Sequence, residues 1–89
     1  MVAVIKDPYP ALRPMRLDDV DDVARIESAA YAFPWTPGIF RDCLRAGYGC
    51  WVLARAAEIV GYGVLSVAAG EAHVLNVCVA PTEQGKGYG

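Results

Sequence analysis

The sequence CWVLARAAEIVGYGVLSVAAGEAHVLNVCVAP, residues 50–81, decides the fold. It contains three runs rich in valine and other apolar residues, at positions 50–54, 59–67 and 72–79, and these runs predict three β-strands. Short turns at residues 56–58 and 69–71 separate the runs. Because connections this short join antiparallel neighbours, the strands are predicted to form a meander. Their apolar residues occupy both alternating faces, which predicts a sheet that helices cover on both sides.

A first helix is predicted upstream of the meander, after a short extended segment in which Pro14 disfavours helix at Arg13. Asp18 is the predicted N-cap, and the acidic residues after it stabilise the first turn through the helix dipole. The apolar residues that fall near one face are Val20, Val23, Ala24 and Ala30. The acidic cluster is therefore interpreted as helix initiation rather than as a metal site.

A second helix is predicted to begin at Thr36, which is the N-cap, with Pro37 in the first helical position. One of its sides is apolar, formed by Ile39, Phe40, Cys43 and Leu44. Gly47 or Gly49 is predicted to end this helix. Residues 33–35 consequently lie in the connection between the two helices.

Composition and charge limit the classes of function. The chain has 89 residues, too few for a second domain, and its 55% hydrophobic content predicts elements that belong to a larger core. Residues 1–89 are therefore predicted to be the N-terminal part of a single α/β domain with a mixed sheet. The net charge of −2 argues against direct binding of nucleic acid or of an anionic membrane. Without a membrane span or leader pattern in the sequence, a cytoplasmic location is expected.

The cysteines and the histidine do not predict a metal or disulfide site. Cys43, Cys50 and Cys78 are odd in number and lack C-x-x-C spacing, and His73 is the sole histidine. Strand alternation places His73 and Cys78 on opposite faces, so no base is predicted beside the Cys78 thiol. Cys78 is interpreted as a packing residue, and no metal is expected.

A glycine-rich loop follows the last predicted strand. It consists of Gln84, Gly85, Lys86, Gly87, Tyr88 and Gly89. Its glycines allow tight turns and let backbone N–H groups approach an anion, although a simple flexible turn fits glycines alone equally well. The spacing fits neither G-x-G-x-x-G nor the Walker pattern. It fits Q-x-x-G-x-G directly after a strand that ends in V-x-P.

The chain resembles the GCN5-related N-acetyltransferases from about residue 12 to residue 89. The order of its elements, followed by Q-x-x-G-x-G, is similar to the first half of that fold, up to the fourth strand and the pyrophosphate loop. The sequences AYAFPWTPGIF, residues 30–40, and LNVCVAPTEQGKGYG, residues 75–89, resemble more specifically the ribosomal-protein alanine N-acetyltransferases. That family acetylates the N-terminal alanine of a small-subunit ribosomal protein.

The resemblance implies acetyl-CoA as co-substrate and direct attack of the acceptor amine on the thioester within a ternary complex. It implies that the loop of residues 84–89 binds the pyrophosphate. It further implies that the strand edge at Val77, Cys78 and Val79 pairs with the pantetheine arm, where a backbone N–H polarises the acetyl carbonyl.

Phe33, Pro34 and Trp35 admit two compatible interpretations. Aromatic residues beside a proline are by default core filling between helices. The resemblance implies that this loop also borders the groove for the acceptor's N-terminal peptide. Glu27 and Glu71 are the remaining carboxylates that could be proposed as bases, and both are expected to be solvated, one on a helix face and the other in a turn.

The resemblance places the family's catalytic glutamate and tyrosine beyond Gly89, so no catalytic residue is assigned in this chain, and the 89 residues alone are expected to be inactive. The predicted strand at 72–79 has an exposed edge, which predicts self-association of the isolated chain. Two alternatives stay open at this point. The acceptor is another amine, such as a small molecule, an amino acid or a lysine, or the chain is an inactive binding module that captures a partner by strand addition.

Overall fold

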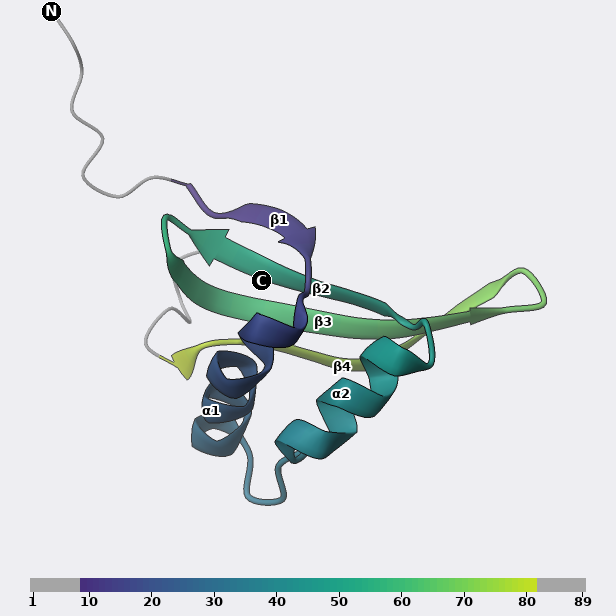
Figure 1. Cartoon of the computed structure of the whole chain (residues 1–89), viewed down its shortest axis with the longest axis horizontal. Coiled ribbons are helices and arrows are strands. Elements are labelled where there is room, and N and C mark those ends of the chain that lie inside the picture. Colours follow the sequence, from purple (N-terminus) through teal and green to yellow (C-terminus); the bar gives the residue numbers. More distant parts are fainter. Residues whose placement is uncertain (1–8, 82–89) are drawn as a thin grey trace, which may run out of the picture.

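The computed structural model describes residues 9–81, which form one antiparallel sheet with two helices packed against it (Figure 1). The four strands are adjacent in chain order. The elements are β1 (Ala11–Pro14), the 3-10 turn η1 (Leu17–Asp19), α1 (Val20–Ala30), α2 (Pro37–Arg45), β2 (Gly49–Arg55), β3 (Glu58–Ala68) and β4 (Glu71–Val79). The predicted helices, strands and meander are confirmed, with the strands of the meander one residue longer at most of their ends.

The two tight turns of the meander depend on residues with positive φ. Ala69 and Gly70 have φ of 53° and 80°, the pattern of the hairpin turn whose twist matches the flanking strands. Ala56 adopts φ of 55° in the turn between β2 and β3. Because these turns join neighbours directly, β4 becomes an outer strand of the sheet.

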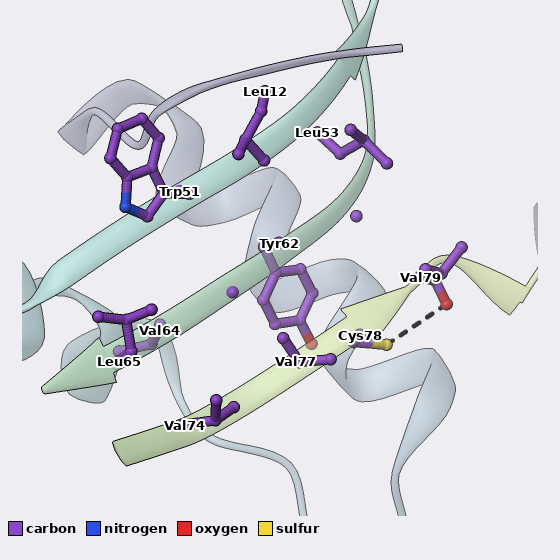
Figure 2. A pocket seen from close by; sticks show the side chains of 12 residues that line it. Leu12, Trp51, Leu53, Tyr62, Val64, Leu65, Val74, Val77, Cys78 and Val79 are labelled. Carbon is purple, nitrogen blue, oxygen red and sulfur yellow. Dashed lines mark hydrogen bonds between the residues drawn. The ribbon is translucent and has the colours of Figure 1, made fainter. Parts of the chain in front are cut away.

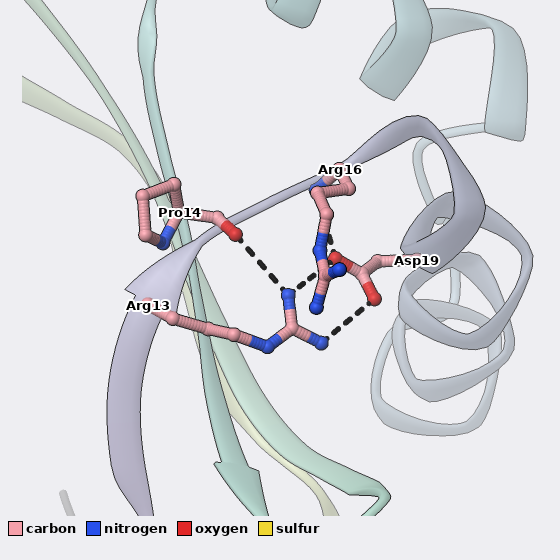
Figure 3. A network of polar contacts seen from close by, with 4 residues as sticks. All are labelled: Arg13, Pro14, Arg16 and Asp19. Atoms are coloured by element: carbon pink, nitrogen blue, oxygen red, sulfur yellow. Dashed lines mark hydrogen bonds and ion pairs between the residues drawn. The ribbon is translucent and has the colours of Figure 1, made fainter.

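The first helix begins differently from the prediction, and the choice of Asp18 as its N-cap is wrong. The chain enters α1 through η1, and the Asp19 carboxylate accepts a hydrogen bond of 2.8 Å from the Arg16 backbone N–H. The Arg13 guanidinium donates two further hydrogen bonds to Asp19, at 2.8 and 2.9 Å (Figure 3). Asp19 thereby ties the end of β1 to the start of α1.

The second helix begins and ends as predicted. The Thr36 hydroxyl accepts a hydrogen bond from the Ile39 N–H, and Pro37 occupies the first turn. At the other end Gly47 has φ of 81°, a conformation that glycine adopts at no steric cost. The Tyr48 N–H then donates to the Cys43 carbonyl at 3.1 Å, which closes the last turn.

Both helices lie on one face of the sheet, so the prediction of helices on both faces is wrong for the described residues (Figure 1). The buried core forms between this face and the helices, and Phe40, Val52 and Val23 in it are fully buried. The opposite face is apolar as well, but in residues 9–81 no helix covers it. None of the described helices is long and apolar enough to span a membrane.

An irregularity in β4 changes which side chains face the helices. The pairing of β3 with β4 shifts between Val64, opposite Asn76, and Leu65, opposite Val74, so that Leu75 is an extra residue. The side chains before Leu75 therefore alternate between the two faces of the sheet in the opposite phase to those after it. His73 and Cys78 consequently share a face, contrary to the prediction, although His73 is exposed near the far end of β4 and contacts Glu71.

Candidate cofactor and acceptor site

The strand segment predicted to bind the cofactor lies at the end of β4, on the outer edge of the sheet. The Val77 carbonyl accepts a hydrogen bond of 3.1 Å from the Tyr31 hydroxyl, so its peptide groups point away from β3. Backbone direction alternates along an antiparallel strand, and the groups of Cys78 therefore point toward β3. Of these two residues, Val77 presents its backbone at the outer edge.

The predicted pyrophosphate loop, residues 84–89, lies outside the described residues. The structure describes the chain that leads to it: the Ala80 N–H donates to the Val60 carbonyl at 2.8 Å, and Pro81 follows. The roles of Gln84, Gly85, Lys86, Gly87, Tyr88 and Gly89 therefore stay predictions.

Cys78 packs in the core, as its interpretation as a packing residue requires. Its side chain is buried with the residues between the sheet and the helices, and its thiol contacts the Val79 carbonyl at 3.4 Å. The thiols of Cys43 and Cys50 are also buried and free of disulfides. Burial raises the pKa of both these thiols, which keeps them protonated at neutral pH.

In the loop between the helices, the two interpretations of residues 33–35 apply to different aromatic residues. Trp35 is half-buried, and its ring lies 5.3 Å from that of Phe40, so it serves the core. Phe33 is 95% exposed, together with the exposed Pro34. An aromatic side chain held in solvent at a loop tip is available to contact a ligand.

The expectation that Glu27 is solvated is wrong. Glu27 is only 2% exposed, on the face of α1 that packs on β3 and β4. Its carboxylate accepts hydrogen bonds from the Trp35 N–H at 2.9 Å, from the Asn76 side-chain amide at 2.9 Å and from the Tyr62 hydroxyl. The helical period held the signal, since Glu27 lies four residues after Val23 and three after Ala24 on the same buried face.

The second carboxylate, Glu71, has an exposed side chain at the start of β4, as expected. Tyr62 in contrast is buried between the helices and the sheet, with its ring edge-on to Phe40. Burial, followed by the neighbouring Glu27 carboxylate, raises the pKa of the Tyr62 hydroxyl. The hydroxyl therefore stays protonated and acts as a donor to Glu27.

A pocket of about 430 Å³ joins the interhelical loop to β4. Its walls come from the end of α1, the loop and the irregular part of β4, and are formed by Glu27, Tyr31, Ala32, Phe33, Trp35, Leu75 and Asn76. The structure thus brings the loop predicted to receive the acceptor next to the strand predicted to bind the cofactor. Only Phe33 and Trp35 of these seven residues were predicted as site residues.

A second, apolar pocket of about 340 Å³ lies on the uncovered face of the sheet (Figure 2). Leu12, Trp51, Leu53, Leu65, Val74 and Val77 project into it from all four strands. It is nearly without polar groups, so it resembles an exposed packing surface more than a site for chemistry. Among residues 9–81, no cluster of histidine, cysteine and carboxylate side chains could hold a metal ion.

Comparison with known proteins places these features in a family. Residues 16–89 match the family model described as Acetyltransferase (GNAT) family. A Bacillus subtilis protein provisionally named as a ribosomal protein bS18-alanine N-acetyltransferase is 30% identical over 81 residues, which are 89% of this chain and 54% of that protein. The Haemophilus influenzae ribosomal protein bS18-alanine N-acetyltransferase is 28% identical over 71 residues, 80% of this chain and 49% of that protein.

Two solved structures share the fold. The ribosomal-protein-S18-alanine N-acetyltransferase from Escherichia coli superposes with a TM-score of 0.80 at 24% identity, over 88% of this chain and 50% of the other. Ard1 from Thermoplasma volcanium gives a TM-score of 0.75 at 22% identity, over 86% and 53% respectively. The chain spans about half the length of each of these relatives. Because the family model covers residues 16–89, the chain belongs to the GNAT family of acetyltransferases.

Proposed function

We propose that this chain is the donor-binding and acceptor-binding part of an N-acetyltransferase that moves acetyl from acetyl-CoA to the N-terminal alanine amine of a small-subunit ribosomal protein. The observation that carries the proposal is the pocket between the interhelical loop and β4, because Tyr31, which lines it, donates a hydrogen bond to the Val77 carbonyl at the sheet edge. The names of the curated relatives support this acceptor.

The outer edge of β4 fits the donor. The pantetheine arm of acetyl-CoA is an extended chain with amide groups, and such a chain can hydrogen-bond to a strand edge as an added strand does. Backbone groups make these bonds, so the apolar side chains of Val77 and Val79 are compatible with the role. The glycines of residues 84–89 would supply backbone N–H groups to the pyrophosphate.

The pocket beside β4 fits a peptide acceptor. Phe33 offers an exposed aromatic surface at the rim, and Tyr31 offers a hydroxyl close to the strand. A peptide entering here brings its terminal amine toward Val77. A small first side chain such as that of alanine keeps the amine close to the strand.

Direct transfer is the mechanism that these residues support. Acetyl-CoA supplies an activated thioester, and a backbone N–H at the β4 edge would stabilise the negative charge that develops on the carbonyl oxygen. The Cys78 thiol is buried in the core, and the Glu27 carboxylate is occupied by three donors. Neither is therefore placed as a nucleophile at this edge. The base and the acid of the reaction are proposed to lie beyond Gly89.

The test uses the extended protein, by which we mean this chain followed by whatever residues its gene encodes after Gly89. It is incubated with acetyl-CoA and a peptide that begins with alanine, and the peptide mass is measured. The control is the same peptide with its terminus already blocked. We expect one added acetyl group on the open peptide and none on the blocked peptide.

Two results would contradict the proposal in different ways. Acetylation of a lysine side chain or a small amine, with none at the alanine terminus, would show an acetyltransferase with a different acceptor. Binding of a protein partner through the β4 edge, with no acetylation of any amine, would favour a binding module.

A further inference from the structure

The Glu27 carboxylate joins three separate parts of the fold. Its Oε2 accepts from the backbone N–H of Trp35 in the interhelical loop. Its Oε1 accepts from Asn76 on β4 and from the Tyr62 hydroxyl on β3. These partners lie 8, 49 and 35 residues away in the sequence. One side chain on α1 therefore holds the loop and two strands.

Because the Glu27 carboxylate is buried, it depends on these hydrogen bonds. A carboxylate removed from water is stable only where hydrogen-bond donors replace its hydration, because an unpaired buried charge costs several kcal/mol. All three partners of Glu27 are neutral donors, and each reaches a carboxylate oxygen. The position of each donor is thus fixed relative to the other two, because moving one leaves part of the charge without a partner.

The loop and β4 differ in how firmly other contacts hold them. The end of β4 is held by its pairing with β3, in which Gly61, Tyr62 and Gly63 lie opposite Val79, Cys78 and Val77. Around the loop, the Trp35 N–H bond to Glu27 and the Trp35 ring contact with Phe40 hold the side next to the core. Phe33 extends from the same loop into solvent.

We propose that Glu27 is a positioning residue that sets the acceptor loop, residues 32–36, against the irregular part of β4 at Asn76. In this role Glu27 touches neither the donor nor the acceptor. It fixes the width of the pocket between Phe33 and β4, and through it the approach of the acceptor amine to Val77. The effect of Glu27 on acetyl transfer rests on the proposed function. Its effect on the position of the loop does not.

Asn76→Ala in the extended protein is the most informative variant. Asn76 is part-buried, and its substitution removes one donor from Glu27 without touching the loop. Glu27→Gln is the stronger variant, since an amide cannot accept from all three donors. Glu71→Gln is the matched control, because it makes the same chemical change on an exposed side chain at the other end of β4.

The kinetic readout separates positioning from loss of folded protein. We expect Asn76→Ala and Glu27→Gln to raise the KM for the alanine peptide by roughly tenfold, the effect of one lost hydrogen bond to a charged group. The KM for acetyl-CoA should change by less than about twofold, since β3 holds the donor strand. A purely structural role would lower kcat and leave both KM values unchanged, and that result would overturn the proposal.

The second readout needs no acetyl transfer. Hydrogen exchange at the Trp35 amide should be faster in Asn76→Ala than in the native protein, although Asn76 makes no hydrogen bond to Trp35, and unchanged in Glu71→Gln. Unchanged Trp35 exchange in both Asn76→Ala and Glu27→Gln would overturn the proposal. If the native protein acetylates no amine, the proposed function fails, while the exchange measurement still decides the role of Glu27.

Discussion

The two faces of the sheet are built from similar residues but have different surroundings. On the face toward α1 and α2, Val52, Tyr62 and Val64 are buried beneath Phe40 and the helices. On the other face, Trp51, Val74 and Val77 keep much of their surface in solvent (Figure 2). The first face holds a finished core, whereas the second is an apolar surface with no cover in residues 9–81. Substitutions on the covered face should therefore mainly lower stability, and substitutions on the uncovered face should mainly change association.

The largest effect is expected at the centre of the covered face. Phe40 is fully buried and its ring contacts those of Trp35 and Tyr62. Phe40→Ala in the extended protein should lower the free energy of unfolding by about 3–5 kcal/mol, through lost burial and the cavity left behind. Denaturant unfolding measures this change. A loss below about 2 kcal/mol would show that Phe40 does not lie at the centre of a closed core.

Two glycines of β3 sharpen the comparison at the cofactor strand. A Cβ at Gly61 would lie 3.0 Å from the Cys78 carbonyl oxygen, whereas the atom nearest to a Cβ at Gly63 would be a side-chain carbon of Val77, at 3.1 Å. Backbone yields less readily than an exposed side chain. Gly61→Ala should therefore cost about 1–3 kcal/mol of stability and weaken acetyl-CoA binding, and Gly63→Ala should cost less. If denaturant unfolding gave equal losses of stability for Gly61→Ala and Gly63→Ala, β4 would not be held tightly against β3.

Acid should weaken the link between β1 and α1. The Arg13 guanidinium, together with the Arg16 N–H, holds the pKa of the Asp19 carboxyl below its usual value. A lowered folded-state pKa stabilises the fold above the unfolded-state pKa, which is about 3.9, and this stabilisation is lost as pH falls through the folded value.

Asp19→Asn should therefore lower stability at pH 7 by about 1–2 kcal/mol and flatten the stability curve below about pH 4. Asp18→Asn is the control, since it removes the neighbouring charge at an exposed position. Unfolding curves between pH 2 and pH 7 make the comparison. An Asp18→Asn curve as flat as that of Asp19→Asn would contradict the role given to Asp19.

The smallest effect on stability, with a large effect on association, is expected on the uncovered face. We predict that the isolated 89-residue chain self-associates through this face and the β4 edge. The double change Val74→Lys and Val77→Lys should reduce association while shifting unfolding by only about 0.5 kcal/mol. Ala57→Lys, in an exposed turn, is the charge control. Sedimentation measures the outcome, and a monomeric native chain with a cooperative melt would contradict the prediction.

Features of the fold that depend on neighbouring residues could be predicted from the sequence. The Thr36 cap, the Gly47 helix end and the turn at Ala69 and Gly70 each need only a few adjacent residues. The meander followed from these local signals, because short turns allow few arrangements.

Features that depend on distant partners could not be predicted in this way. Glu27 is buried because Asn76 and Tyr62, 49 and 35 residues away, supply donors. The extra residue Leu75 changes the facing of β4, and no pattern within the strand marks it. Asp19 replaces Asp18 because the position of Arg13 on β1 decides which carboxylate it reaches. The loop of residues 84–89 stays a prediction.

The central claim is that the outer edge of β4 receives the donor. Its most direct test is hydrogen exchange or NMR of the extended protein, with and without acetyl-CoA, read at the Val77 amide. We predict that acetyl-CoA slows Val77 exchange by at least about tenfold and leaves the Val52 amide, in the middle of the sheet, unchanged. Saturating acetyl-CoA that leaves the Val77 amide unprotected and unshifted would contradict the claim.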